Sequence, residues 1–200
     1  MAISTEGWLD WAERIDGIPD KVYSEPNKGS GLCCHSIEGS IDGALERFLN
    51  TDRVPGRPDW YTDYAAASCM FLNPKTGALI QMYPITASTW TSGSRSANTS
   101  LWAIESEGKA GEPLNANQVA NMLRLAGEWE AHTGKVASRE NLLGTRTVWE
   151  HNEVSDSPTA CPSGRYAPFY AALAERDDGE ELTPEQKEFL DWAPARLSAI

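Results

Sequence analysis

Short apolar runs of strand length occur together with amphipathic helical stretches in this chain, and that mixture restricts the fold more than any other feature. The strand-like runs read LCCHSI, AASCMFLN, ALIQMYPI, LWAIESEG and RTVWEH, with KVYS as a shorter one. Strands and amphipathic helices each bury one side, so a chain that has both packs them in layers. With 200 residues and 40% hydrophobic composition, one main domain with a sizeable core is expected. The sequence therefore predicts an α/β or α+β architecture.

Two neighbouring runs have the features of a β-hairpin. AASCMFLN and ALIQMYPI are separated by PKTG, which has turn composition. The loop STWTSGSRSANTS follows and leads into LWAIESEG, whose short length favours a strand over a helix.

Amphipathic helices are predicted from the spacing of apolar residues at four places in the main domain. They cover residues 6–15, 40–50, 115–134 and 164–176. Ser40 is a suitable N-cap for the second helix. Asn115 and Gln118 form a capping-box-like start for the third, and Gly134 is its stop. Pro168 fits the fourth helix if it falls in the first turn.

The chain is expected to divide into a main domain, residues 1–176, and an acidic C-terminal extension, residues 177–200. The extension begins with DDGEE and continues as a predicted helix capped by Thr183, which is either docked or the start of a linker. Residues 51–64 read TDRVPGRPDWYTDY and have the composition of a loop. The sequence contains no internal repeat.

The charge and the N-terminal sequence exclude several classes of protein. A net charge of −12 and a pI near 4.7 argue against a nucleic-acid surface, because phosphate binding needs clustered Lys and Arg. The N-terminal segment MAISTEGWLDWAERIDG is amphipathic and acidic, unlike a signal peptide. No segment approaches the roughly 20 apolar residues of a membrane span. We therefore expect synthesis in the cytoplasm, no nucleic-acid partner and no membrane span.

Four cysteines are too few and too irregularly spaced for a disulfide scaffold, so reduced thiols are expected. Cys33, Cys34 and Cys69 lie in apolar strand-like runs and are expected to be small core residues. Cys161 lies in a polar loop instead, which calls for a different explanation.

The stretch from Thr145 to Tyr166, TRTVWEHNEVSDSPTACPSGRY, presents a histidine at the end of a strand-like run and a cysteine in the following loop. Catalytic zinc sites use three protein ligands and keep a fourth position open. His151 and Cys161 would supply two of them, and His35, also at the end of an apolar run, is the best third candidate. The alternative is that each histidine is an ordinary structural or surface residue.

Four motifs in the expected order make the chain resemble the zinc-dependent N-acetylmuramoyl-L-alanine amidases of the peptidoglycan-recognition-protein fold, also called amidase type 2, and phage endolysins in particular. The motifs are LCCHSIEGSIDGALERF, SCMFLNPKTG, TWTSGSRSANTSLWAIE and EHNEVSDSPTACPSG. The resemblance runs from about Leu32 to about Tyr170. It implies an α/β fold with a mixed central sheet of about five or six strands flanked by helices, and a catalytic role for residues 1–176.

The resemblance also implies Zn²⁺ bound by His35, His151 and Cys161, and bacterial peptidoglycan as the substrate. By position, Glu105 in LWAIE would be the general base, and Thr159 would donate a hydrogen bond to the oxyanion. The alternative for Glu105 is an exposed strand charge beside Glu107, and for Thr159 an ordinary loop residue.

Three further residues are candidates for substrate binding. Trp90 is expected to line the groove, with a core position as the alternative. Arg95 and Asn98 are candidates for contacts with the peptide carboxylates or the sugar, with surface solvation as the alternative. The resemblance implies that the protein works as a monomeric endolysin. Such an enzyme is released from an infected host cytoplasm and acts on the cell wall.

The chain departs from the family pattern at several positions. Met70 stands where the hairpin often has His, and Thr91 stands where the tryptophan loop often reads W-H. Some phage members carry a catalytic tyrosine where this chain has Cys69 or Ser68, so any tyrosine role is in doubt here, and Tyr61 or Tyr64 would be only remote substitutes. These departures bear on the supporting residues and leave the expected ligands unchanged.

Two other functions compete with this interpretation. A cysteine-dependent peptidoglycan peptidase or amidase would use Cys34 as nucleophile and His151 as base, although such a nucleophile normally opens a helix and Cys34 lies in a strand-like run. A non-catalytic peptidoglycan-recognition module would keep the fold without turnover. Such members usually lose the cysteine ligand, so the presence of Cys161 favours an enzyme.

Overall fold

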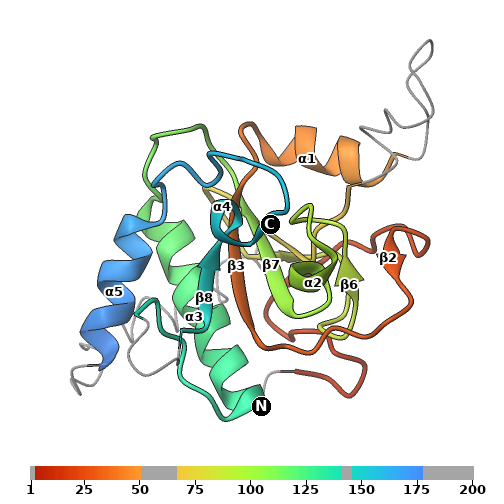
Figure 1. Cartoon of the computed structure of the whole chain (residues 1–200), viewed down its shortest axis with the longest axis horizontal. Coiled ribbons are helices and arrows are strands. Elements are labelled where there is room, and N and C mark those ends of the chain that lie inside the picture. The colour runs from red at the N-terminus through yellow and green to blue at the C-terminus, as the bar shows by residue number, and fades with distance from the viewer. Residues whose placement is uncertain (1–2, 51–66, 141–145, 178–200) are drawn as a thin grey trace, which may run out of the picture.

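A computed structural model of the protein describes residues 3–50, 67–140 and 146–177 (Figure 1). A six-stranded sheet in the order β1-β5-β4-β7-β3-β8 lies at its centre, and a second pair, β2 and β6, lies beside it. The strands are β1 (Glu13–Arg14), β2 (Val22–Tyr23), β3 (Gly31–Ser36), β4 (Phe71–Asn73), β5 (Ile80–Gln81), β6 (Ser88–Thr89), β7 (Leu101–Ser106) and β8 (Val148–Glu150). The helices are α1 (Ile41–Phe48), α2 (Arg95–Asn98), α3 (Ala116–Thr133), α4 (His151–Val154) and α5 (Ala167–Asp177). The expected mixed sheet flanked by helices is confirmed.

The sheet is mixed because one hairpin joins an otherwise parallel group. Strand β3 runs parallel to both β7 and β8, and β4 runs parallel to β7. Strand β5 is antiparallel to β4, which confirms the predicted hairpin. The parallel strands β3, β7 and β8 all end at the same edge, so side chains at their carboxyl ends meet there.

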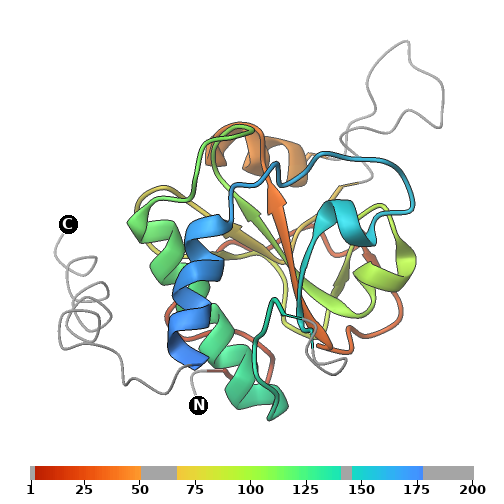
Figure 2. The same cartoon turned by 60° about the vertical axis from the view of Figure 1, so that its left-hand side comes forward.

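One face of the sheet is covered by α3 and α5, which lie side by side in both views (Figures 1 and 2). Leu32 and Cys34 from β3 and Ile104 from β7 point to this face, and they pack against Trp129 of α3 and Phe169 of α5. All five side chains are fully buried. This is the larger apolar cluster of the described residues, and it accounts for the apolar positions of both helices.

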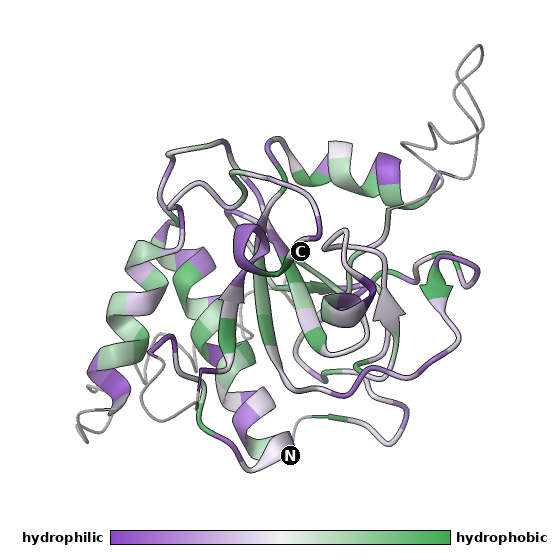
Figure 3. Ribbon diagram, in the orientation of Figure 1, coloured by the Kyte–Doolittle hydropathy of each residue, from purple (hydrophilic) through white to green (hydrophobic). Residues whose placement is uncertain are grey.

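The opposite face carries the alternate residues of the same strands. Ala103 of β7 packs there with Ala44 and Phe48 of α1, while Cys33 of β3 packs with Ala97 of α2. In Figure 3 the central strands are mainly hydrophobic and the short helix α4 at their carboxyl end is hydrophilic. The polar end of this face is where a site accessible to solvent can form.

Local signals set the helix ends as the sequence predicts. The Ser40 side chain accepts a hydrogen bond from the Gly43 backbone N–H at the start of α1. Asn115 and Gln118 form a complete capping box at the start of α3, and Gly134 ends that helix in the left-handed conformation with φ of 69°. The helix predicted over 164–176 is confirmed from Ala167 onward, and Pro168 falls in the first turn of α5 as expected, while residues 164–166 form a turn.

The predicted helix over residues 6–15 is wrong. Trp8, Trp11 and Ile15 have helical spacing, but the segment forms turns and then the short strand β1, which pairs in parallel with β5. The Leu9 backbone N–H donates to the Gln81 side chain, and the Ile15 N–H donates to the Gln81 carbonyl. Hydrogen bonds to a distant strand therefore override the local spacing.

Some predictions fall outside the described residues. These are the loop over 51–64 with Tyr61 and Tyr64, and residues 178–200 of the predicted 177–200 extension, with its helix capped by Thr183. Within the described ranges, no helix combines the length and the apolar character that crossing a membrane requires.

Candidate functional site

Three side chains gather at the carboxyl edge of the parallel strands, and we call them the His-His-Cys cluster. His35 lies near the end of β3, His151 is the first residue of α4 directly after β8, and Cys161 lies in the loop before α5. One donor atom from each lies within 4.8 Å of the other two. The two imidazole rings have centroids 4.4 Å apart. The fold thus brings together the three residues that the sequence analysis grouped.

The donor atoms of the cluster suit a zinc ion. His35 Nδ1 is buried and has no hydrogen-bond partner among the described residues. His151 Nε2 contacts the carbonyl oxygen of Ser92, which leaves its Nδ1 available. Cys161 Sγ accepts a hydrogen bond from the Ser36 backbone N–H at 3.1 Å. Two imidazole nitrogens and one sulfur are ligands that zinc prefers, and a buried nitrogen without a partner is costly unless something binds it.

Burial sets the charge of these groups. It lowers the pKa of His35 well below its ordinary value, and the neighbouring His151 adds to that effect. Burial also lowers the pKa of His151, so both rings are held in the neutral form that binds metals. Burial, followed by the nearby Glu105 charge, raises the pKa of the Cys161 thiol to about 12. A bound cation would reverse that balance and favour the thiolate.

Glu105 stands beside the cluster. Its Oε1 lies 3.9 Å from His35 Nδ1, and its Oε2 is buried without a hydrogen-bond partner among the described residues. Burial raises the pKa of Glu105 to about 7, with Arg47 opposing the rise. The alternative of an exposed strand charge does not fit this side chain, which is only 14% exposed.

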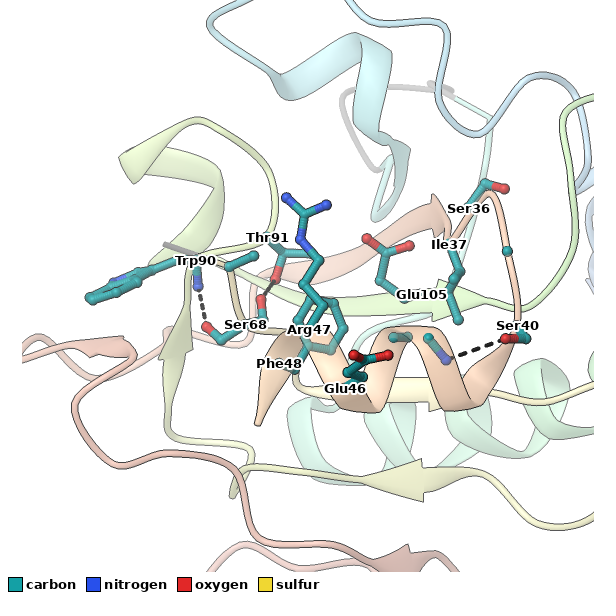
Figure 4. Close-up of a pocket in the computed structure, with 14 residues that line it drawn as sticks. Ser36, Ile37, Ser40, Glu46, Arg47, Phe48, Ser68, Trp90, Thr91 and Glu105 are labelled. Carbon is teal, nitrogen blue, oxygen red and sulfur yellow. Dashed lines mark hydrogen bonds between the residues drawn. The ribbon is translucent and has the colours of Figure 1, made fainter. Parts of the chain in front are cut away.

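Glu105 also lines a pocket of about 490 Å³ that opens between α1 and the loop after β6. Figure 4 shows the Glu105 carboxylate, the Arg47 side chain and Thr91 on this pocket, with the ring of Trp90 pointing away from the other labelled residues. The other described lining residues are Ser36, Ile37, Gly39, Ser40, Gly43, Ala44, Glu46, Phe48, Ala67 and Ser68. A space of this size beside the cluster has room for part of a ligand.

Thr159 lies close to the cluster because it precedes Cys161 by two residues in the same loop. Its hydroxyl oxygen accepts a hydrogen bond from the Cys161 backbone N–H at 3.2 Å. That bond uses a lone pair of the oxygen, so the hydroxyl hydrogen stays available for donation.

The three residues expected to bind substrate lie in different environments. Trp90 is among the residues that line the pocket, and its ring packs edge-on against Tyr23. Arg95 pairs with Glu25 on the surface and its guanidinium lies over the Tyr23 ring. Asn98 is buried and its Oδ1 accepts from loop backbone N–H groups. The structure brings neither Arg95 nor Asn98 to the described lining of the pocket.

Cys34 is badly placed for the competing cysteine mechanism. It points into the core on the face covered by α3 and α5, opposite to His35. Burial raises the pKa of its thiol well above the ordinary value. A fully buried thiol on the far face of the sheet cannot serve as a nucleophile with His151.

Sequence reasoning missed two residues that shape the site. Ser92 contacts both histidine rings, yet its Ser-rich surroundings indicated only a polar loop. Arg165 is 1% exposed and binds three backbone carbonyls and the Ser36 hydroxyl. A buried arginine runs against the usual exposure of its type, so no local signal predicts it.

The mixed sheet with a His-His-Cys cluster at the carboxyl edge of its parallel strands defines a class of α/β proteins with a candidate metal site. The sequence model of the N-acetylmuramoyl-L-alanine amidases, Amidase_2, matches residues 25–164. The chain therefore belongs to the N-acetylmuramoyl-L-alanine amidase family. No curated protein matches it in sequence.

Solved structures of similar fold include a selenomethionine derivative of AmpD, with 18% identity and a TM-score of 0.64 over 86% of this chain and 99% of that one. The Staphylococcus aureus hydrolase AmiA in complex with its ligand has 17% identity and a TM-score of 0.60, covering 82% of each chain. A mutant endolysin from Bacillus subtilis has 16% identity and a TM-score of 0.59, over 81% of this chain and 97% of that one. At these identities the likeness establishes the fold, and the predicted amidase type 2 fold is confirmed.

Proposed function

We propose that this protein is a zinc-dependent amidase that hydrolyses the bond between N-acetylmuramic acid and L-alanine in peptidoglycan. The observation that carries the proposal is the His-His-Cys cluster with the Glu105 carboxylate beside it. Family membership supports the amide bond, and the cluster supports the metal.

His35, His151 and Cys161 would hold the ion, with the two imidazoles neutral and the sulfur as thiolate. When bound, zinc polarises the substrate carbonyl and lowers the pKa of water. Glu105 connects the cluster to the pocket, because it lines the pocket and its Oε1 lies 3.9 Å from His35 Nδ1, so the scissile amide would lie on this side of the cluster.

Glu105 is the proposed general base. Its Oε2 has no partner among the described residues, so it is free to take a proton from the attacking water and to pass it to the leaving amine. Thr159 is the proposed donor to the oxyanion, through the hydroxyl hydrogen that its bond to Cys161 leaves free.

The pocket is the proposed site for the part of the substrate next to the amide, with Trp90 on its wall. The sequence predicts that Arg95 and Asn98 contact the substrate. Arg95 would do so outside the pocket, and Asn98 would act indirectly, by supporting the loop of Thr91 and Ser92. Residues 1–176 would form the catalytic domain, working as a monomer.

The biological role we propose is that of a phage endolysin. The support is the resemblance of the four motifs to phage enzymes and the similarity of the fold to solved endolysins. In that role the enzyme acts on the bacterial wall after release from the infected host cytoplasm. Purified protein added to walls of candidate hosts should then reduce their turbidity.

Digestion of purified peptidoglycan followed by mass spectrometry tests the chemistry. The proposal predicts stem peptides with free L-alanine amino termini and intact glycan strands. New reducing sugar ends, or cleavage inside the stem peptide, would contradict it. Loss of activity with a chelator and recovery with zinc is expected, and activity that survives chelation but not thiol alkylation would point to the cysteine mechanism.

A further inference from the structure

Ser92 contacts the rings of both histidines in the His-His-Cys cluster. Its hydroxyl oxygen lies 3.2 Å from His35 Nε2, and its backbone carbonyl oxygen lies 3.2 Å from His151 Nε2. Ser92 itself is 1% exposed. Histidine ligands of metals are normally oriented by a partner on the ring nitrogen that does not face the ion. Here one residue serves as that partner twice.

The chemistry of Ser92 fixes which nitrogen each ring can offer. A carbonyl oxygen only accepts hydrogen bonds, so His151 carries its proton on Nε2 and keeps a lone pair on Nδ1. His35 has a buried Nδ1 with no partner in the described part of the chain. If that atom binds a cation, Nε2 carries the proton and donates it to the Ser92 hydroxyl, whose own hydrogen can turn to Cys33 Sγ at 3.7 Å.

The loop that carries Ser92 is held in place by Asn98. Asn98 Oδ1 accepts from the Ser92 backbone N–H at 2.8 Å and from the Thr91 N–H at 3.2 Å. Asn98 is 4% exposed and lies at the end of α2. The Thr91 hydroxyl donates to the Ser68 carbonyl at 2.8 Å. The backbone N–H groups of Thr91 and Ser92 and the hydroxyl of Thr91 are therefore all held by hydrogen bonds within the protein.

We infer that Ser92 is a positioning residue that orients both histidine ligands of the proposed zinc site, with Asn98 holding its loop. The inference rests on the proposed zinc function. Ser92 orients His35 through its side chain and His151 through its backbone, so a substitution of the side chain separates the two contacts.

The substitution Ser92→Ala, with Ser94→Ala as control, tests the inference. Ser94 lies two residues further along the same loop, is 5% exposed and makes no capping bond with its side chain. Competition with a chelating dye should show a zinc Kd for Ser92→Ala that is raised about 10- to 100-fold over wild type. Ser94→Ala should match wild type, and the metal-free forms of both variants should melt at similar temperatures.

Nitrogen-detected NMR of the zinc-loaded protein supplies a second readout. Both histidines should carry their proton on Nε2, and in Ser92→Ala the His35 Nε2 proton should exchange faster while that of His151 is unchanged. An unchanged zinc Kd in Ser92→Ala, or a His35 ring protonated on Nδ1, would overturn the role of Ser92. A wild-type protein that binds no zinc would instead overturn the proposed function.

Discussion

His35 and Glu105 are direct register partners on the parallel strands β3 and β7, and their side chains approach to 3.9 Å between Nδ1 and Oε1. Paired positions on neighbouring strands face the same side of a sheet. The backbone ladder thus fixes the distance between a proposed zinc ligand and the proposed base, while His151 and Cys161 come from segments that follow β8.

Glu105→Gln should keep zinc binding and lose turnover. The amide has nearly the same shape but cannot accept and return the proton, so kcat should fall about 10²- to 10⁴-fold. Glu107→Gln is the matched control, because Glu107 binds the Lys75 backbone N–H instead. Turnover on purified peptidoglycan and zinc content are the measurements. A Glu105 variant with near wild-type kcat would remove it as the base.

Cys161→Ser should abolish zinc binding and turnover together, because serine does not replace a thiolate as a ligand at neutral pH. Cys34→Ala is the control, since Cys34 points into the core away from the cluster. It should cost some stability and keep its activity per folded molecule. Full activity in Cys161→Ser would contradict the assignment of the ligands. A Cys34→Ala variant that is folded but inactive would support the cysteine mechanism instead.

Thr159→Val should keep zinc binding and reduce kcat. Valine has a similar shape but no hydroxyl, and removal of one oxyanion donor costs about 10²- to 10³-fold. The variant also removes the acceptor for the Cys161 N–H, so zinc affinity is measured alongside. Unchanged kcat with unchanged affinity would assign Thr159 to the loop alone.

Zinc should raise the melting temperature of the metal-free protein. A ligand at 100 times its Kd stabilises the folded state by about 2.7 kcal/mol. For a chain of this size that corresponds to a rise of about 5–10 °C in Tm. Differential scanning fluorimetry with zinc and with magnesium makes the comparison, and Cys161→Ser should show no rise with zinc. An equal rise in that variant would indicate binding elsewhere.

Arg165→Met should destabilise the fold more than a surface change does. The Arg165 guanidinium donates to three backbone carbonyls and to the Ser36 hydroxyl while 1% exposed, and methionine removes all four hydrogen bonds. The carbonyls of Ser106 and Glu107 keep a second donor each, from the Ile37 N–H and from Gln118 Nε2, so the loss falls mainly on the Ser36 hydroxyl and the Glu112 carbonyl. We expect a loss of about 2–4 kcal/mol in the free energy of unfolding by urea denaturation. Arg14→Met is the control, because the Arg14 side chain is 51% exposed. Equal effects would contradict this account.

Local patterns predicted those parts of the fold that local physics decides. The capping box of Asn115 and Gln118 determines where α3 begins, and the apolar run ending at Ser36 forms the central strand β3. The segment 6–15 has helical spacing too, but its backbone finds Gln81 and β5, which no window of neighbouring residues reveals.

The site was predictable where a residue type and a motif agreed. His35, His151 and Cys161 stand in recognisable motifs, and the fold places their donor atoms within 4.8 Å. Ser92 and Arg165 gave no signal, because their roles depend on contacts with residues 57 and 129 positions away in sequence. Supporting residues of this kind are defined by tertiary structure rather than by composition.

The most direct test of the zinc-dependent amidase is a titration of zinc into metal-free protein with turnover of purified peptidoglycan measured at each point. One site made of His35, His151 and Cys161 predicts a rate that is near zero without metal, rises in proportion to added zinc and levels off at one ion per chain. Full turnover by the metal-free protein, or no turnover at any zinc level in a folded sample, would contradict the account.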